Sequence, residues 1–228
     1  MDNISRYAAG KPDLMVSDAA SLRGLYVITH HQHSPDQQLY DQATMAIRGG
    51  AKILQYRDKS RGQKKRLAQA EKLRLLTRQK NCIFIINDDI SLTKAVQADG
   101  VHLGGEDASI ETARSELGDQ AIIGVSCYNE FDRAVSAQQQ GASYAAFGRF
   151  YKSSTKPGEI YASLELLKQA KNQLDIPIVA IGGISYENAD PLIQAGADMI
   201  AVADGVFGQP DIRQAANQLQ LLFDKQDS

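Results

Sequence analysis

The sequence predicts a single (β/α)₈ barrel of the TIM type, which is an α/β fold. Three observations lead to this prediction: eight short apolar runs recur along the 228 residues, segments with helical periodicity separate them, and glycine-containing turns precede several of the runs. Eight such units in about 200 residues fill one barrel more economically than two doubly wound domains. Because no Ser-, Gly- or Pro-rich linker divides the chain, we expect one barrel domain over residues 22–228 after a short N-terminal extension over residues 1–21.

The eight apolar runs have the length and composition of buried parallel strands. They are continuously rich in Val, Ile and Leu, whereas half-solvated antiparallel strands alternate polar and apolar residues. In chain order the runs cover residues 25–29, 53–56, 82–86, 100–103, 121–125, 143–147, 177–181 and 199–203.

Helical segments and turns lie between these runs. In segment 63–79, Leu67, Ala70, Leu73 and Leu76 recur three residues apart, which we interpret as one apolar stripe of a helix. Strands that alternate with helices form βαβ units. Four segments between a helix and the next strand contain glycine, which we expect to cap the helix in a left-handed conformation: 48–52, 97–100, 140–143 and 194–198.

Composition argues against two classes of function. With 25 Lys and Arg against 27 Asp and Glu, the chain lacks the basic excess of a nucleic-acid binder. No apolar run reaches the ~18–20 residues that cross a bilayer, and the first residues lack the apolar core of a signal peptide. Cys82 and Cys127 lie in apolar stretches, so we expect buried, reduced thiols in a cytoplasmic protein, without a disulfide or a zinc site.

The chemistry of such a barrel lies where the strands end and the following loops begin. After the second run, Gln55, Arg57 and Lys59 share one face if the strand period of two continues. Three hydrogen-bond donors, two of them cationic, match the oxygens of a diphosphate, which Arg binds bidentately. The alternative is a solvated strand end with surface charges.

Carboxylates follow the third and fourth runs. Asn87, Asp88 and Asp89 come after the third run, and Glu106 and Asp107 come after the fourth. Two carboxylates from adjacent strand ends, together with phosphate oxygens, suit Mg²⁺. The alternative is that these aspartates cap the helices that follow.

The last four strand ends predict a second anion site. Ser126 ends the fifth run, and the loop 151–158 after the sixth run carries hydroxyls and lysines beside Gly and Pro. Gly182 and Gly183 follow the seventh run, where backbone N–H groups of a glycine-rich turn bind phosphate in many barrels. The sequence therefore predicts two phosphate centres, one with a metal and one with backbone amides.

Histidine and cysteine offer weaker candidates. We interpret His30, His31 and His33 as residues of a solvated loop, because their spacing is uneven for a metal site. His102 lies between apolar neighbours and is predicted to be a hydrogen-bonded core residue. A nucleophilic role for Cys127 is discounted, because no histidine follows residue 102 in the chain.

Over residues 22–223 the chain resembles the thiamine-phosphate synthase family. The motifs that carry the resemblance, in order, are Gly24-Leu25-Tyr26-x-Ile28-Thr29, Gln55-x-Arg57-x-Lys59, Ile86-Asn87-Asp88-Asp89, Gly100-Val101-His102-Leu103-Gly104, Ser153-x-Thr155-Lys156 and Ile181-Gly182-Gly183-Ile184. The resemblance implies a (β/α)₈ barrel and a transferase. Its implied reaction condenses hydroxymethylpyrimidine diphosphate with hydroxyethylthiazole phosphate and releases thiamine monophosphate and pyrophosphate.

The resemblance also implies residue roles. The residues implied to hold the pyrimidine diphosphate are Gln55, Arg57, Lys59, Asn87, Ser126 and Lys156. Arg57, Lys59, Ser126 and Lys156 are the catalytic candidates among them. Asp88 and Asp107 are the implied Mg²⁺ ligands. The residues implied to hold the thiazole phosphate are Ser153, Thr155, Gly183, Ala203 and Asp204.

The chain departs from the family pattern at four of the rim positions. Ser153 stands where Thr is common, Arg149 and Lys152 stand where Pro is common, and Asp204 stands where Ser is common. Because a carboxylate repels phosphate, we expect only backbone contact at Asp204. The implied mechanism is a Mg²⁺-assisted dissociative displacement without a protein nucleophile, in which cations take up the charge of the departing pyrophosphate.

Three other functions stay open at this point. A thiamine-phosphate sensor keeps a phosphate cradle but has no need of the metal carboxylates. A thiazole tautomerase has the same fold but is expected to use a histidine in the loop where this chain has Arg149. An aldolase would use Lys156 as a Schiff-base lysine. The expected partners are small-molecule substrates, not nucleic acid or membrane, and a homo-oligomer is compatible with the sequence.

Overall fold

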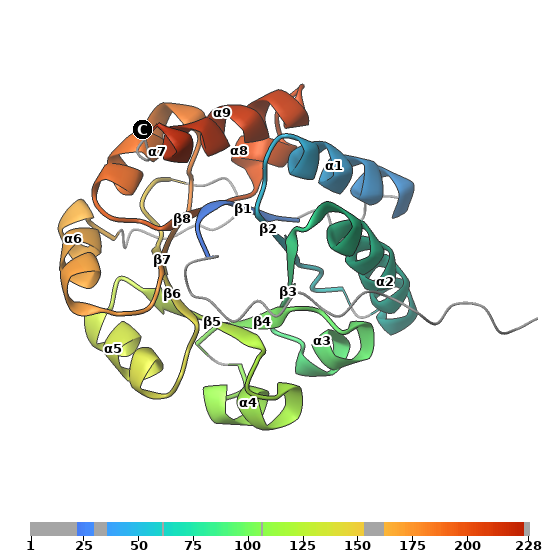
Figure 1. The fold of residues 1–228 in the computed structure, drawn as a ribbon, viewed down its shortest axis with the longest axis horizontal. Coiled ribbons are helices and arrows are strands. Elements are labelled where there is room, and N and C mark those ends of the chain that lie inside the picture. Colours follow the sequence, from blue (N-terminus) through green and yellow to red (C-terminus); the bar gives the residue numbers. More distant parts are fainter. Residues whose placement is uncertain (1–21, 30–35, 61, 106, 153–161, 226–228) are drawn as a thin grey trace, which may run out of the picture.

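The computed structural model describes residues 22–29, 36–60, 62–105, 107–152 and 162–225. Its strands are β1 (Gly24–Ile28), β2 (Ile53–Tyr56), β3 (Ile83–Asn87), β4 (Gly100–Leu103), β5 (Ile122–Tyr128), β6 (Tyr144–Gly148), β7 (Ile178–Ile181) and β8 (Met199–Val202). Neighbouring strands pair in parallel and in chain order, and β8 pairs with β1, so the sheet closes (Figure 1). The predicted (β/α)₈ barrel is confirmed.

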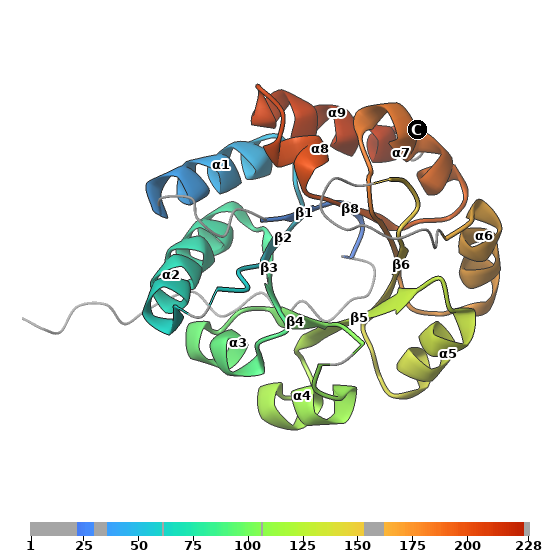
Figure 2. The same cartoon turned by 180° about the vertical axis from the view of Figure 1, so that it is seen from behind.

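Helices surround the ring of strands in both end-on views (Figures 1 and 2). They are α1 (Asp36–Arg48), α2 (Gln63–Lys80), α3 (Ile90–Val96), α4 (Ile110–Leu117), α5 (Phe131–Gln139), α6 (Leu164–Gln173), α7 (Tyr186–Gln194), α8 (Asp204–Phe207) and α9 (Ile212–Asp224). The last helix, α9, packs against α1 and so completes the outer layer. Within the described residues, no helix is both long and apolar enough to span a membrane.

The core has two layers because successive residues of a strand point to opposite faces. In β3, Phe84 and Ile86 belong to the layer between the strands and the helices, whereas Ile85 lies in the barrel interior. Both layers are apolar, which explains why the strands read as continuous apolar runs rather than as alternating ones. The observed strands begin and end within one residue of the predicted ones, except β5. That strand continues to Tyr128, through a shift in its register with β6.

The predicted apolar stripe of α2 is correct for only part of its length. Ala70, Leu73 and Leu76 are buried, but Leu67 is 38% exposed. A helix has 3.6 residues per turn, so two residues nine positions apart lie on opposite sides of it. Residues spaced three apart therefore move gradually around the helix. Leu76 faces the barrel, and Leu67, nine positions earlier, lies on the other side of the helix.

The turn glycines behave as predicted at three of the four positions. Gly50, Gly141 and Gly196 have φ angles of 110°, 85° and 109°, in the region that favours glycine. In the fourth segment the prediction is wrong: Gln97 takes the left-handed conformation at the end of α3, and Gly100 is part of β4.

Gly100 is required by close strand packing, and we expect Gly100→Ala to destabilise the barrel. A Cβ at this position would lie 1.9 Å from the Ile122 carbonyl oxygen, so β4 or β5 would have to move. The free energy of unfolding should fall by about 1–3 kcal/mol or more, as for other overpacked cores. Urea denaturation measures the change. Gly62→Ala is the control, because the nearest atom there is 3.7 Å away, and equal losses in the two variants would contradict the packing argument.

Candidate active site

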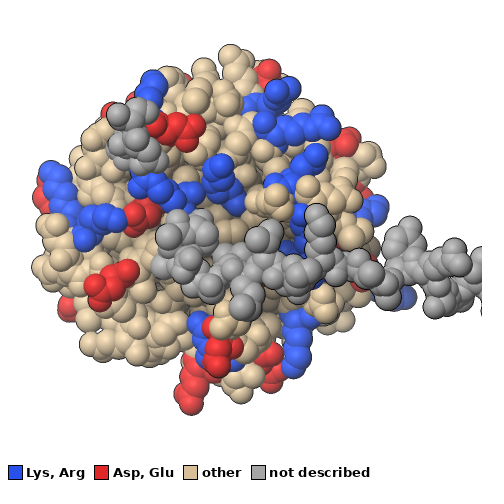
Figure 3. Space-filling model, viewed as in Figure 1, with Lys and Arg blue, Asp and Glu red and all other residues tan. Residues whose placement is uncertain are grey.

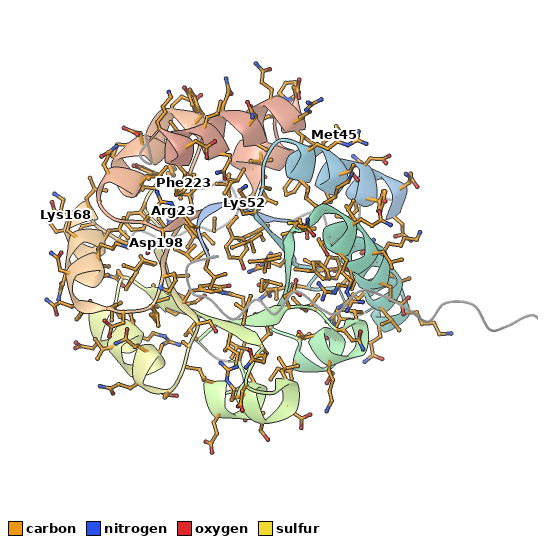
Figure 4. All side chains as sticks on the ribbon, in the orientation of Figure 1. Arg23, Met45, Lys52, Lys168, Asp198 and Phe223 are labelled. Atoms are coloured by element: carbon orange, nitrogen blue, oxygen red, sulfur yellow. The ribbon has the colours of Figure 1, made fainter. Side chains whose placement is uncertain are left out.

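The parallel strands bring all of their carboxyl ends to one end of the barrel. Arg23, Lys52 and Asp198 directly precede β1, β2 and β8, and Figure 4 shows them around the near end of the ring. The loops that follow the strands lie at the other end, which faces the viewer in Figure 2. The amino-end face carries Lys and Arg interspersed with Asp and Glu (Figure 3). The predicted site residues that the structure describes lie near the carboxyl ends of strands or follow them, so the topology brings these residues to the opposite face.

The end of β2 places its three predicted donors in two different environments. Gln55 is 2% exposed, and its Nε2 donates to Tyr26 Oη at 2.7 Å inside the barrel. The strand ends at Tyr56, so its period of two does not extend to Arg57 and Lys59. The Arg57 backbone N–H donates to Thr29 Oγ1 at 2.9 Å, which fixes the loop at the rim.

The residues that cap α3 and α4 are not the predicted metal ligands. Asp89 caps α3, since its carboxylate accepts the backbone N–H of Leu92 at 2.8 Å. Ser109 caps α4 in the same way. Of the three aspartates for which capping was the alternative, only Asp89 caps a helix, which leaves the Asp88 and Asp107 carboxylates for another use.

Asp88 and Asp107 lie side by side at the ends of β3 and β4. Burial raises the pKa of Asp88, and the hydrogen bond and negative charge of Asp107 raise it further, while the Lys59 ammonium lowers it. Lys59 Nζ lies 3.3 Å from Asp88 Oδ2. Asp107 Oδ2 accepts the Gly104 N–H at 2.6 Å. The negative charge of Asp107 hinders the ionisation of Asp88, so a cation bound between the two carboxylates would be stabilised.

A cavity of about 430 Å³ opens beside these groups. Its lining residues are Asp58, Lys59, Ser60, Arg66, Asn87, Asp88, Asp89, Ile90, Ser91 and Ala108. Three predicted site residues, Lys59, Asn87 and Asp88, thus share one cavity of a size that holds a small ligand. Within the described part of the chain, Ser60 Oγ and Arg66 Nε are buried without a hydrogen-bond partner.

Near the end of β5, Ser126 forms a hydrogen bond with a residue of the barrel interior. Ser126 is half-buried, and its Oγ lies 2.9 Å from His102 Nε2. The other ring nitrogen of His102, Nδ1, lies 3.0 Å from Tyr144 Oη. The prediction of a buried, hydrogen-bonded histidine is therefore confirmed, with a predicted substrate-binding serine as one of its partners.

Arg133 and Tyr128 connect the ends of β4 and β5 at the rim. Arg133 Nε donates to the Ser126 carbonyl oxygen at 2.9 Å, and its guanidinium lies 5.2 Å from the centre of the Tyr128 ring. Tyr128 Oη in turn accepts the Gly105 N–H at 3.2 Å. This contact connects the strand end that carries Ser126 to the loop that carries Asp107.

The remaining predicted residues follow β6, β7 and β8. Gly183 has a φ of 67°, and a Cβ there would lie 2.6 Å from the Lys152 carbonyl oxygen, so only glycine fits the turn. Ala203 and Asp204 stand where β8 passes into α8. Ser153, Thr155 and Lys156 lie outside the described residues, as do the three histidines of the predicted loop.

Both cysteines should resist alkylation in the folded protein. Cys82 and Cys127 are free and buried, and burial raises the pKa of each thiol to about 12. Because the thiolate is the reactive form, iodoacetamide at about pH 8 should label them at least about 100-fold more slowly than in urea-unfolded protein. Mass spectrometry of the labelled chain measures this. Fast labelling of Cys127 without unfolding would reopen its role as a nucleophile.

Comparison with known proteins identifies the family. The family model described as "Thiamine monophosphate synthase" matches residues 25–206, from the first strand to the short helix after the last strand. The chain belongs to the thiamine monophosphate synthase family. It is thus an enzyme and a transferase, as predicted.

Individual family members are similar over nearly the whole chain. A thiamine-phosphate synthase of Nitrosococcus oceani is 50% identical over 198 residues, covering 87% of this chain and 91% of the relative. One from Thioalkalivibrio sulfidiphilus is 45% identical over 210 residues, covering 92% and 100%. Among solved structures, a thiamine phosphate pyrophosphorylase from Pyrococcus furiosus superposes with a TM-score of 0.82 at 33% identity, over 91% of this chain and 98% of that one.

In this member of the thiamine monophosphate synthase family, sequence reasoning missed residues that act through contacts between strands. Tyr26 contacts the predicted site residue Gln55, Arg133 contacts Ser126, and Tyr144 contacts His102, which in turn contacts Ser126. Their positions within or beside apolar runs gave no signal of this. Ser60 and Arg66 line the cavity. Ser60 closely follows β2, which was the available signal for it, whereas Arg66 lies on α2.

Proposed function

We propose that this enzyme joins hydroxymethylpyrimidine diphosphate to hydroxyethylthiazole phosphate, forming thiamine monophosphate and releasing pyrophosphate. The observation that carries the proposal is the cluster of Lys59, Asp88 and Asp107 beside one cavity at the carboxyl ends of β2, β3 and β4. A cation and paired carboxylates at such a rim suit a diphosphate and its counterion. Family membership supports the same reaction.

The leaving diphosphate is assigned to Arg57, Lys59 and Asn87. Lys59 and Asn87 line the cavity, and the half-buried Arg57 follows the same strand end as Lys59. The Arg57 guanidinium forms no ion pair with any described residue, so its donors are available to substrate oxygens. Donors already held in place stabilise the charge that develops as the diphosphate leaves.

Asp88 and Asp107 fit a divalent metal. Their oxygens, with the Asn87 amide oxygen nearby, are of the type that Mg²⁺ prefers. Within the described residues no cluster of three His, Cys, Asp or Glu side chains forms. Mg²⁺ commonly binds through one or two carboxylates and keeps water and substrate phosphate among its ligands. When bound, such an ion supplies charge neutralisation to the diphosphate. Asp88 and Asp107, whose charges disfavour each other in the free protein, would hold it.

The bond changes need no protein nucleophile. The C–O bond between the pyrimidine methylene and the diphosphate breaks, and a C–N bond to the thiazole nitrogen forms. Positioning and electrostatic stabilisation are then the contributions of the protein. Gln55 and Ser126 are assigned to the pyrimidine half, and the thiazole phosphate is assigned to the Gly183 turn and the Ala203-Asp204 backbone. From the sequence, Ser153 and Thr155 are also assigned to the thiazole phosphate, and Lys156 is assigned to the diphosphate.

Release of pyrophosphate from the two substrates tests the proposal. With both substrates and Mg²⁺ we expect steady release, and omission of either substrate should abolish it. EDTA should lower the initial rate by at least about 100-fold, since a metal contributes several kcal/mol to such a step. Tight binding of thiamine monophosphate without turnover would instead indicate a sensor. Covalent trapping of a carbonyl substrate on Lys156 by borohydride would indicate an aldolase.

A further inference from the structure

A chain of hydrogen bonds crosses the barrel interior and ends at Ser126. It connects side chains from five strands, in the order Gln55 (β2), Tyr26 (β1), Tyr144 (β6), His102 (β4) and Ser126 (β5). The four successive distances are 2.7, 2.9, 3.0 and 2.9 Å. The first four of these residues are at most 9% exposed.

Each phenol in the chain has one proton to donate. Burial raises the pKa of both Tyr26 and Tyr144, so both keep that proton at neutral pH. The Gln55 amide nitrogen only donates, and therefore Tyr26 Oη accepts from it. Tyr26 then donates to Tyr144, which is its other partner among the described residues.

The direction of these bonds determines the proton position on His102. Tyr144 accepts from Tyr26, so its own proton goes to His102 Nδ1. An imidazole whose Nδ1 accepts is neutral and carries its proton on Nε2. Nε2 therefore donates to Ser126 Oγ. Because that oxygen already accepts a hydrogen bond, the hydroxyl proton of Ser126 is left for a different acceptor.

Packing holds the two rings in the centre of the chain. The His102 and Tyr144 rings stack at 5.7 Å with an angle of 17° between their planes. Tyr144 also lies directly over Gly124 of β5, where a Cβ would be 1.9 Å from the ring carbon Cζ. The surrounding interior layer is apolar, with Ile53, Ile85 and Val179 among its members. In apolar surroundings a polar group without a hydrogen-bond partner costs free energy. The hydrogen-bonded side chains are therefore held in a single arrangement in which each has its partners.

We propose that His102 is a positioning residue for the reaction: as the Nε2–H tautomer it donates to Ser126 and so makes the Ser126 hydroxyl a hydrogen-bond donor to substrate. The ligand atom that Ser126 meets is then an acceptor, such as a pyrimidine ring nitrogen or a phosphate oxygen. This inference rests on the proposed function in so far as Ser126 contacts the pyrimidine diphosphate. The reverse direction requires the Gln55 amide to accept from Tyr26, and it yields the Nδ1–H tautomer with a Ser126 that accepts from substrate.

The first test reads the tautomer in the unmodified enzyme without substrates. In protein labelled with ¹⁵N-histidine, the protonated and unprotonated ring nitrogens of a neutral imidazole have separate chemical shifts. The chain has four histidines. The signals that persist in each of the variants His30→Gln, His31→Gln and His33→Gln therefore belong to His102. We expect protonation on Nε2 alone. Protonation on Nδ1, or on both nitrogens, would overturn the proposal.

The second test asks whether His102 acts through Ser126. His102→Phe keeps a ring against Tyr144 but loses the hydrogen bonds to Tyr144 and Ser126, and we expect kcat/KM to fall about tenfold. His102→Gln keeps an amide donor and should recover most of that loss. In a Ser126→Ala background, His102→Phe should cause almost no further loss. If His102→Phe lowers kcat/KM by the same factor with and without Ser126, the two residues act independently and the proposal fails.

A matched variant controls for the loss of any buried hydrogen bond. Thr77 is fully buried on α2, outside the barrel interior, and its Oγ1 donates to the Arg74 carbonyl oxygen at 3.0 Å. Thr77→Val should leave kcat/KM within about twofold of the wild type. A tenfold loss in this variant would show that the assay reports general destabilisation. The tautomer is read without substrates, so a wild-type enzyme that releases no pyrophosphate would refute the proposed function and not the proton arrangement.

Discussion

Replacing Arg57 by alanine is expected to lower kcat for pyrophosphate release by about 10²–10³-fold, the usual effect of removing one preorganised donor to developing charge. The guanidinium lies at the carboxyl end of β2 and forms no ion pair with the described residues, so its removal leaves no buried carboxylate unpaired. The fold should therefore persist, with an unfolding midpoint in urea close to that of the wild type. Steady-state release of pyrophosphate at saturating substrates and Mg²⁺ measures the effect.

Two further variants make the Arg57 result specific. Arg57→Lys keeps the charge but loses the planar pair of donors, and it should recover only part of the activity. Arg78→Ala removes an exposed arginine of α2 whose Nη2 donates to Gln97 Oε1 at 3.2 Å, and it should leave turnover unchanged. An Arg57→Ala enzyme that turns over at the wild-type rate would remove Arg57 from the diphosphate site.

Asp88→Asn is expected to lower kcat by at least about 100-fold and to raise the Mg²⁺ concentration needed for half-maximal rate. The substitution keeps the size of the side chain but removes one of two adjacent carboxylates. In the metal-free protein it also removes a charge whose burial, together with repulsion by Asp107, raises the pKa of Asp88, so stability should hold or rise slightly. Loss of activity without loss of stability is expected for a residue whose charge binds a ligand and does not stabilise the fold. Mg²⁺ titrations of the initial rate, together with urea denaturation, measure both effects.

Asp211→Asn is the matched control for the loss of one carboxylate. Asp211 caps α9 by accepting the Gln214 N–H at 2.9 Å, and asparagine caps helices about as well as aspartate does. This variant should keep the wild-type rate and Mg²⁺ requirement. If Asp88→Asn responds to Mg²⁺ as the wild type does, the metal belongs elsewhere.

The strand ends show why capping and catalysis are difficult to separate in a sequence. Asp88 and Asp89 are adjacent and chemically identical, and both were candidates for a helix cap and for a metal site. In the folded chain Asp88 has a φ of 64°. Asp89 turns to the first N–H groups of α3, while Asp88 lies against Lys59 and Asp107. The distinction depends on backbone conformation, which no spacing of residue types encodes.

Much of the fold was predictable because a strand that is buried on both faces is a continuous run of apolar residues in the sequence. A strand such as β3 packs against helices with one set of residues and fills the barrel with the other, so all of its positions before the terminal Asn87 are apolar. Parallel topology then places every strand end on one rim, and this is why Lys59, Asn87 and Asp88 were predicted together and lie around one cavity. The α2 stripe failed at Leu67, because an apolar spacing of three drifts around the helix.

The fold class, the family and the rim on which the polar groups gather could be predicted from the sequence, because they follow from local composition and from the order of the motifs. Which of those groups contact one another depends on how the chain folds in three dimensions. Lys59 pairs with Asp88, Arg133 braces Ser126, and His102 joins Ser126 to Tyr144 across the barrel. The contacts of Lys59 and His102 connect residues from different strands or loops, so they exist only when the sheet has formed in its particular register. Arg133 and Ser126 are closer in the chain, and they meet where β5 is followed by α5. Hydrogen bonds and ion pairs act over a few ångströms, and only the folded backbone brings such distant positions within that range.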